Sequence, residues 1–361
     1  MGALEPVTVA GRGAWAAQAR AGSADGPPWT SGLVGWLGYE AGAWFERMPD
    51  PVSGRLLPDA WWGRVGPVVV LDRDGTVRYR RGVPLDALTS PPARVAAPPR
   101  AHRLEEPADE TFLDGVRTVL DHLRAGDCYQ VNLSRRVVAR GRFDPLATWL
   151  HVRSSNESRR GLFIQTDSGA ILANSPELLL RARGRRALSV PIKGTAAAET
   201  DPSDLRRSEK ERAELTMIVD LVRAELGRIA EPGSVRTGAR RVGRVGHLWH
   251  AMQRVLATLP PGRDAVDALA ALFPPGSVTG APKVRAMEVI RALERVPRGV
   301  YCGASGWMGP AGADMNVAIR TISIRGDEAH VQAGSGLVLH SVPERELAEA
   351  RLKAVRLLEA L

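Results

Sequence analysis

Four lysines are the residues in this chain whose type most suggests chemistry. The sequence holds 49 basic residues, and subtracting the four lysines leaves 45 arginines. Lysine is compact and can lose its proton to act as a nucleophile or base, which arginine cannot do in a protein. The pattern predicts that lysine is kept where an amine or ammonium is needed; a coding bias toward arginine is the alternative. The four are Lys193, Lys210, Lys283 and Lys353.

Lys193 is the first candidate catalytic residue, because it lies in PIKGT between an apolar pair and a glycine. Desolvation there would lower the pKa of its amine and favour a nucleophile or base. A lysine lying on the surface is the competing interpretation. Glu177 in NSPELLL has apolar neighbours that would raise its pKa and suit an acid. His247 in RVGHLWH is a candidate acid–base group or, equally, a structural histidine.

Two predicted helices each carry glutamates spaced three residues apart on one face. Such pairs on separate helices suit Mg²⁺, which prefers a few carboxylates together with waters and substrate oxygens. Exposed Glu–Lys pairs are the alternative interpretation. The residues are Glu211 and Glu214 on helix 208–229, and Glu346, Glu349 and Lys353 on helix 343–360.

Glycine-containing segments precede two of these features. In FPPGSVTGAPK, Lys283 falls in the first turn of a predicted helix over 282–296, where the helix dipole disfavours it. The segment therefore predicts an anion or a carboxylate-rich pocket beside it. VQAGSGLVLHS predicts a strand and then a loop, in which Gly334 and Gly336 let backbone N–H groups approach a carboxylate. The S-x-x-E pattern of 341–344 predicts a capping box for the last helix.

The composition is that of an ordinary soluble globular protein. At 361 residues with 44% hydrophobic and 25% charged residues, the chain can form one large domain or two packed lobes. It contains neither an apolar stretch of about 18 residues nor a signal-peptide pattern, which predicts a cytoplasmic protein without a membrane partner. Cys128 and Cys302 form no CxxC motif, which disfavours a zinc site or disulfide framework.

The formal net charge of +9 and the basic run 236–244 raise the question of nucleic acid. No aromatic residues are interleaved with the basic run, and no nucleic-acid motif accompanies it. We therefore expect no nucleic-acid partner. A positive field also suits an anionic small substrate or an acidic partner.

The periodicities predict an α+β protein built on antiparallel sheets. Residues 84–107 carry six prolines and are predicted to be a linker or surface crossing. This divides the chain into a short N-terminal region, 1–107, packing on the core, and a catalytic domain, 108–361. The strands are predicted at 128–138, 161–166, 170–182, 187–192, 317–325 and 328–333, and the helices at 111–126, 208–229, 282–296 and 343–360.

Together these segments resemble the chorismate-utilising enzymes, and among them aminodeoxychorismate synthase component I. The resemblance covers about residues 33–46 and then 111–361. It implies a two-lobed antiparallel β-sandwich surrounded by helices, with Mg²⁺ and chorismate bound in a cleft. The matching segments, in family order, are GWLGYE, CYQVNLSRR, SPELLL, PIKGT, ERAELTMIVDLVRAELGR, FPPGSVTGAPKVRAMEVI, YCGASGWMG, NVAIRTI and AGSGLVLHSVPERELAEARLK.

The resemblance also implies roles for individual residues. It implies that Glu214 and Glu346 bind the metal ion, assisted by Glu211 and Glu349. The residues that it implies in contact with the substrate carboxylates are Tyr301, Arg320, Gly334, Gly336 and Lys353. The residues implied to line the substrate ring are Gly194, Thr195, Thr279 and Gly280.

Two positions bear on which reaction the resemblance implies. Isochorismate-forming relatives carry a lysine base where this chain has Gln130, and anthranilate synthases usually carry alanine where it has Lys193. In aminodeoxychorismate synthases that lysine attacks C2 of chorismate as the C4 hydroxyl leaves, and Glu177 would protonate the hydroxyl. Ammonia then replaces the lysine by attack at C4.

The resemblance implies a partner as well, because no cysteine-based glutaminase module is visible in the chain. A separate glutamine amidotransferase would supply the ammonia, and the product would serve p-aminobenzoate and folate biosynthesis. Anthranilate synthase component I is the main alternative, then isochorismate synthase; a non-catalytic relative that only binds a partner is a further one. The chain departs from the family pattern at 196–199, 223–226 and His250.

Overall fold

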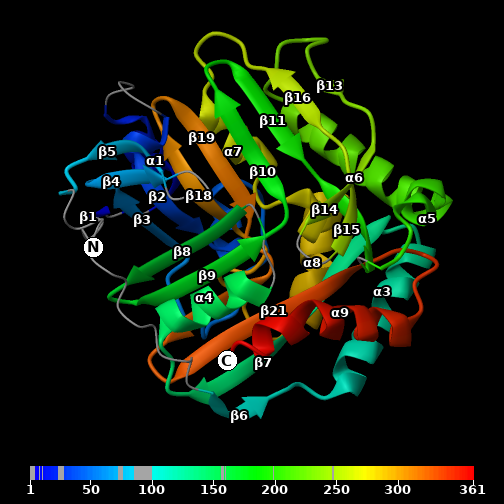
Figure 1. The fold of residues 1–361 in the computed structure, drawn as a ribbon. Helices are drawn as coiled ribbons and strands as arrows, with labels where there is room; N and C mark the ends of the chain where they lie inside the picture. Colours follow the sequence, from blue (N-terminus) through cyan, green and yellow to red (C-terminus); the bar gives the residue numbers. More distant parts are fainter. Residues whose placement is uncertain are drawn as a thin grey trace.

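The computed structural model describes residues 5–7, 9, 11–22, 28–71, 76–84, 100–155, 158, 160–197, 199–245 and 248–361. Two large antiparallel sheets form its framework, and Figure 1 shows them as two lobes with helices on their outer faces. The helices are α1 (Arg12–Arg20), α3 (Asp109–Arg124), α4 (Pro145–Ser155), α5 (Pro202–Arg207), α6 (Glu209–Gly227), α7 (Ala265–Leu272), α8 (Lys283–Leu293) and α9 (Pro343–Leu358), with 3-10 turns η1 (Pro28–Thr30), η2 (Tyr39–Trp44) and η3 (Gly276–Val278).

The nine-stranded sheet draws its strands from both ends of the chain. Strand β2 pairs with β18, so that Trp36 lies opposite Ser305. The N-terminal region is thus part of this sheet, and the predicted boundary at residue 107 does not divide one sheet from another. The strand order is β1 (Glu5–Val7), β3 (Ala60–Arg64), β2 (Leu33–Leu37), β18 (Ala304–Gly309), β19 (Gly312–Val317), β10 (Leu178–Arg183), β11 (Arg186–Val190), β16 (Val255–Thr258) and β13 (Arg236–Thr237).

The second large sheet has seven strands, and two small sheets accompany it. Its order is β17 (Gly280–Ala281), β7 (Gln130–Gly141), β21 (Glu328–Leu337), β20 (Thr321–Arg325), β9 (Gly169–Ser175) and β8 (Arg160–Thr166), with β6 (Ala101–Glu105) also pairing with β7. The small sheets are β12 (Ile192–Ala197), β15 (Leu248–Met252) and β14 (Arg241–Val245), and β4 (Val68–Leu71) with β5 (Val77–Arg81).

Two of the predicted segments are corrected by this topology. The end of the predicted linker forms strand β6, while residues 85–99 lie outside the described part of the chain. The single strand predicted over 170–182 is two strands, β9 and β10, which belong to different large sheets. The chain passes from one lobe to the other between them, at Pro176, which cannot donate a ladder hydrogen bond.

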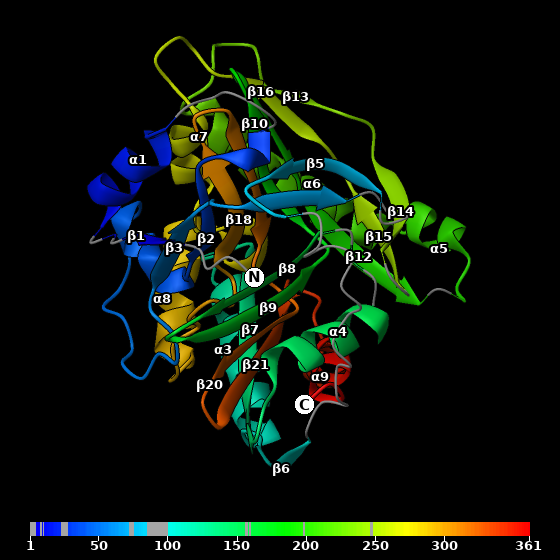
Figure 2. The ribbon, with the colours of Figure 1, turned by 60° about the vertical axis from the view of Figure 1, so that its left-hand side comes forward.

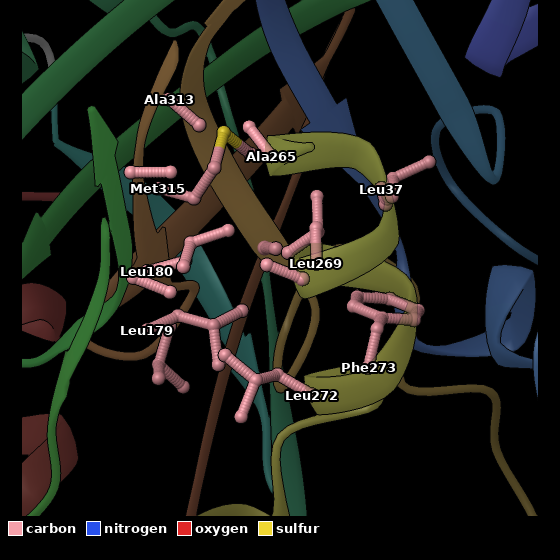
Figure 3. Packing of buried hydrophobic residues seen from close by; sticks show 14 of the residues in the cluster. Leu37, Leu179, Leu180, Ala265, Leu269, Leu272, Phe273, Ala313 and Met315 are labelled. Carbon is pink, nitrogen blue, oxygen red and sulfur yellow. The ribbon is translucent and has the colours of Figure 1, made fainter. Parts of the chain in front are cut away.

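Apolar side chains fill the space between the sheets and beneath the helices. Trp36 of the nine-stranded sheet packs in one buried cluster with Ile164 and Ile171 of the seven-stranded sheet. Figure 3 shows Leu269 and Leu272 of α7 lying against β10 and its neighbours. The first contact buries the inner faces of the two sheets, as a sandwich requires, and the second covers the outer face of the nine-stranded sheet.

Helices cover the outer faces. Helices α3, α8 and α9 pack on β7 and β21, whereas α6 and α7 pack on the other lobe. Figure 2 shows α3, α4 and α9 gathered around β7, β20 and β21. The predicted α+β class and the two-lobed antiparallel sandwich surrounded by helices are confirmed. No helix in the described ranges is both long enough and apolar enough to span a bilayer.

Two local predictions near α9 are wrong. The capping box is not formed, because the Ser341 hydroxyl accepts the Val338 N–H at 3.1 Å and Val342 occupies the N-cap. The glycines of VQAGSGLVL are not in a loop, since β21 continues through Gly334 and Gly336 to Leu337.

Candidate active site

A cavity of about 430 Å³ lies where the two lobes meet. Strand β12, the η3 turn, the second half of β21 and helices α6 and α9 form its walls. This volume suits a small ligand. Its lining includes most of the site residues predicted from the sequence, namely Glu177, Lys193, Gly194, Glu211, Glu214, Tyr301, Arg320, Gly334, Gly336, Glu346, Glu349 and Lys353.

Lys193 projects its amine into the interior of this cavity. Strand β12 positions it, and Nζ donates to the backbone oxygen of Ser277 at 3.3 Å. Burial lowers the pKa of the amine, and the nearby positive charge of Lys353 lowers it further, against the opposing effect of Glu214 and other carboxylates. The site therefore favours the neutral amine more than water does, and the neutral amine is the form that can attack an electrophile.

Glu177 lies on the same cavity, in the turn that joins β9 to β10. Its side chain is buried, and this burial raises the pKa of the carboxyl to about 7 despite the opposing positive charge of Lys193. A carboxyl group with this pKa is partly protonated at neutral pH, so it can donate a proton to a leaving group. An acid and an amine therefore face the same space.

Gln130 lies just behind the cavity wall at the start of β7. A Cβ built on Gly336 would lie 3.0 Å from Lys193 Nζ and 3.4 Å from Gln130 Cδ, which places the amide beside the amine. Both polar atoms of the Gln130 amide are buried without a hydrogen-bond partner among the described residues. An amide does not titrate in this range, so Gln130 cannot serve as the base that activates water.

Helices α6 and α9 bring the four predicted carboxylates to one side of the cavity. Burial raises the pKa values of Glu211 and Glu214. Glu349 adds to the rise at Glu211, and Glu211 and Glu346 add to the rise at Glu214. Burial also acts to raise the pKa of Glu349, but the Lys353 ammonium at 2.6 Å outweighs it and the pKa is lowered. The carboxylates therefore repel one another across the gap between the helices.

This donor set fits the hard cation that the sequence analysis predicts. Carboxylate oxygens are the protein ligands that Mg²⁺ prefers, and a cation would relieve the mutual repulsion. In the described part of the chain no three carboxylate, imidazole or thiol groups already stand close enough together to hold a metal ion. To hold such an ion, the side chains of α6 and α9 would have to move closer together.

Cationic groups also line the cavity. Arg320 has a φ of +53°, a left-handed conformation that non-glycine residues adopt rarely and often at functional sites. Burial lowers the pKa of its guanidinium, while Tyr301 and Glu349 act to raise it. Lys353 donates to the Gly334 backbone oxygen at 2.9 Å. These groups can receive the carboxylates of an anionic substrate.

Gly334 and Gly336 of β21 lie on this wall, and a side chain at each would meet a different neighbour. A Cβ on Gly334 would lie 2.2 Å from the backbone oxygen of Leu133 on β7, so a side chain there would force the strands apart. At Gly336 the obstacle at 3.0 Å is the Lys193 amine, the end of a flexible side chain. Gly334 thus allows β21 to pair closely with β7, whereas Gly336 leaves space for the amine of the candidate nucleophile Lys193.

Some predicted site residues lie elsewhere. Thr279 and Gly280, predicted at the substrate ring, stand behind the cavity wall; the Thr279 hydroxyl donates to Pro275 O at 3.0 Å. Ser277 and Val278 line the cavity in their place. His247 and the side chain of Thr195 lie outside the described residues.

Lys283 does not reach the cavity. Its Nζ lies 2.6 Å from Glu225 Oε1 in a buried ion pair that joins α8 to α6. The anion predicted beside this helix start is thus a carboxylate of the chain itself. Glu225 is one of the departures from the family pattern, and it keeps a negative charge opposite the lysine.

Sequence reasoning missed several residues of the cavity wall. They include Asn132, Gln332 and His250. Asn132 could have been found, because it alternates with Gln130 along the predicted strand, and its amide Nδ2 is buried without a partner among the described residues. His250 was noted only as a departure from the family pattern.

Comparisons with known proteins identify the family of this chain. Residues 8–359 match the family of chorismate binding enzymes. The chain is 37% identical to anthranilate synthase component 1 of Streptomyces coelicolor, covering 92% of this chain and 74% of that protein. It is 36% identical to aminodeoxychorismate synthase component 1 of Klebsiella aerogenes, covering 92% and 78%.

The fold of this chain is also similar to that of a solved structure. Anthranilate synthase component I from Streptococcus pneumoniae aligns with a TM-score of 0.83 at 29% identity, over 95% of this chain and 84% of that one. Relatives with both names match at similar identity, so the comparisons do not single out one reaction. Given the family match over nearly its whole length, this chain belongs to the chorismate binding enzymes.

Proposed function

We propose that this protein is an aminodeoxychorismate synthase component I, which converts chorismate and ammonia to 4-amino-4-deoxychorismate. The observation that carries the proposal is Lys193, an amine with a lowered pKa inside the cavity that also holds the acid Glu177. Supply of p-aminobenzoate for folate and a cytoplasmic location are parts of the same proposal.

In the first step the neutral amine of Lys193 forms a bond to C2 of chorismate, the ring double bonds shift, and the C4–O bond breaks. Glu177 gives its proton to the departing hydroxyl, which leaves as water. Lys193 is then joined to the ring as a secondary ammonium, and Glu177 is a carboxylate. The raised pKa of Glu177 suits this donation near neutral pH.

In the second step ammonia attacks C4 and the bond between C2 and Lys193 breaks. The lysine leaves as a neutral amine, and the new C4 ammonium gives one proton to the Glu177 carboxylate. The catalyst is thereby restored, and the sum is chorismate plus ammonia giving aminodeoxychorismate plus water. Dividing the substitution in this way is nucleophilic catalysis.

We further propose that Glu214 and Glu346 hold Mg²⁺, assisted by Glu211 and Glu349. Bound there, the ion would supply positive charge that holds the ring carboxylate of the substrate. Arg320 and Tyr301, on the cavity wall, receive the other carboxylate. A separate glutamine amidotransferase supplies the ammonia, and ammonium salts replace it in vitro.

The test is a product assay by liquid chromatography and mass spectrometry, with purified chain, chorismate, Mg²⁺ and ammonium at mildly alkaline pH. We expect aminodeoxychorismate, and a rate at least about a hundredfold lower in Lys193→Ala. Chorismate binding by that variant, measured by calorimetry, should persist. Isochorismate as the product would overturn the proposal, as would full activity of Lys193→Ala.

Anthranilate synthase component I is the second candidate, because relatives with that name are as similar as those named aminodeoxychorismate synthase. That reaction places the amine at C2 and eliminates pyruvate, and it has no need of Lys193. Fluorescent anthranilate from the wild-type chain would establish this candidate. Absence of any turnover, with the amidotransferase added, would favour a non-catalytic relative.

A further inference from the structure

Arg298 is a buried cation directly behind the cavity, and the mechanism above gives it no role. It is 5% exposed and does not line the cavity itself. Its guanidinium forms a fork with Glu294, Nε donating to Oε2 at 2.8 Å and one terminal nitrogen to Oε1 at 2.7 Å. The bidentate geometry fixes the plane of the guanidinium.

The remaining donors of Arg298 hold two stretches of the cavity wall. One terminal nitrogen donates to Val278 O at 2.8 Å and the other to Asn132 O at 2.6 Å. The guanidinium carbon also lies 6.0 Å from the ring centroid of Tyr301. Val278, Asn132 and Tyr301 all line the cavity. One guanidinium thus connects three wall segments that are far apart in the sequence.

Glu294 extends this connection to β7 and β21. Its Oε1 also accepts the backbone N–H and the hydroxyl of Ser134, each at 2.8 Å. The Ser134 hydroxyl in turn accepts from the Gln332 amide at 2.9 Å, and Gln332 lines the cavity. The carboxylate is therefore shared between the cation and the strand that carries Asn132.

The N-terminal motif GWLGYE supports Arg298 from the side away from the cavity. Glu40 accepts the backbone N–H groups of Arg298 at 2.8 Å and Gly299 at 2.9 Å. The guanidinium lies 4.8 Å from the ring centroid of Tyr39, a cation–π distance. The motif thus contacts Arg298, which lies behind the cavity wall.

We propose that Arg298 is a positioning residue for chorismate, which fixes Tyr301 and the wall at Asn132 and Val278, and that Glu294 with Tyr39 and Glu40 fixes Arg298. Only arginine can do this, because four charge-assisted hydrogen bonds in one plane and a stacked ring need its planar fork. The inference rests on the proposed binding of chorismate in this cavity.

The decisive variant is Arg298→Lys, which keeps the charge and loses the fork. We expect the Kd for chorismate, measured by calorimetry with Mg²⁺ present, to rise at least about tenfold. KM should rise with it and kcat should fall by less. A purely structural role would instead reduce the folded fraction and leave the Kd of the folded protein unchanged.

Arg160→Lys is the matched control. Arg160 is a half-buried arginine, bonded to Asp314 and Asn316 between β8 and β19, and it does not line the cavity. We expect this variant to bind chorismate as the wild type does. Equal loss of chorismate affinity in the two variants would overturn the positioning role.

A double variant tests the connection through Tyr301. If Arg298 acts by fixing that ring, Arg298→Lys combined with Tyr301→Phe should weaken chorismate binding by less than the product of the two single effects. Independent, fully multiplicative effects would contradict the proposed route through Tyr301.

Two further variants keep the test decisive if Arg298→Lys does not fold. Glu294→Gln preserves the shape of the carboxylate, and Tyr39→Leu removes only the ring behind the guanidinium; each should raise the Kd at least about threefold. A wild-type chain that fails to bind chorismate would overturn both this inference and the proposed function. Wild-type binding with unchanged affinity in every variant that folds would overturn the inference alone.

Discussion

Gly336 and Lys193 are neighbours on the cavity wall, where a methyl group on the glycine would lie 3.0 Å from the lysine amine. We expect Gly336→Ala to fold normally, because the obstructing group is the flexible end of a side chain. The displaced amine should lower the rate of product formation at least about tenfold. Thermal unfolding and a product assay on the same sample measure both effects.

Gly334→Ala provides the contrasting variant. Its methyl group would lie 2.2 Å from the Leu133 backbone oxygen, so β7 and β21 would have to separate. We expect a loss of about 1–3 kcal/mol in the free energy of unfolding, measured by urea denaturation. If Gly336→Ala proves the less stable of the two, the account of both glycines is wrong.

Ionisation of Glu177 should set how the reaction rate falls at alkaline pH. Its pKa of about 7 leaves the carboxyl protonated below that pH, so the rate of proton donation should fall as the pH rises through about 7. Glu177→Gln should lose most of the activity together with this pH dependence. A rate profile from pH 6 to 9 for both proteins makes the comparison.

The same carboxyl should affect stability with a defined sign. Its folded-state pKa of about 7 lies above the ordinary value of 4.5, so between these values the folded protein binds the proton more strongly than the unfolded chain. The free energy of unfolding, relative to Glu177→Gln, should therefore fall as the pH rises from about 4.5 to about 7 and then level off. An increase over that range would contradict the assigned burial.

Mg²⁺ should stabilise the folded chain through the carboxylates of α6 and α9. We expect the Tm of the wild type to rise with Mg²⁺ concentration, and the rise to be much smaller in Glu346→Gln. Glu344→Gln is the control, because Glu344 lies exposed in the first turn of the same helix. An equal response of all three proteins would exclude Glu346 as a ligand.

The Lys283–Glu225 pair should be structural. Removing one partner, as in Lys283→Met, leaves a buried charge without compensation and should cost about 3–5 kcal/mol of unfolding free energy. Replacing both residues, as in Lys283→Met with Glu225→Leu, should cost much less. Urea denaturation decides this, and a double variant less stable than the single one would contradict it.

The sequence predicted best what depends on local periodicity. The spacing of Glu211 and Glu214, and of Glu346 and Glu349, requires each pair to share a helix face, and the structure places all four on one cavity. It could not predict that Gly336 is the neighbour of Lys193, because β12 and β21 belong to different sheets and meet only in the folded chain.

Local patterns also failed where a competing contact was available. The Ser341 hydroxyl accepts the N–H of Val338 rather than capping α9, since the turn before the helix brings that group nearer. Ser277 rather than Thr279 lines the cavity because the Thr279 hydroxyl bonds back to Pro275 within the η3 turn. Turn geometry of this kind cannot be predicted from a residue pattern.

The pairing of β2 with β18 also sets an order of events during synthesis. The ribosome makes residues 33–37 some 270 residues before their partner strand at 304–309. Until then β2 presents an unpaired edge, which is a template for pairing with other chains. The nine-stranded sheet can form only after residues 304–309 have been made, so its completion depends on a long-range step of folding.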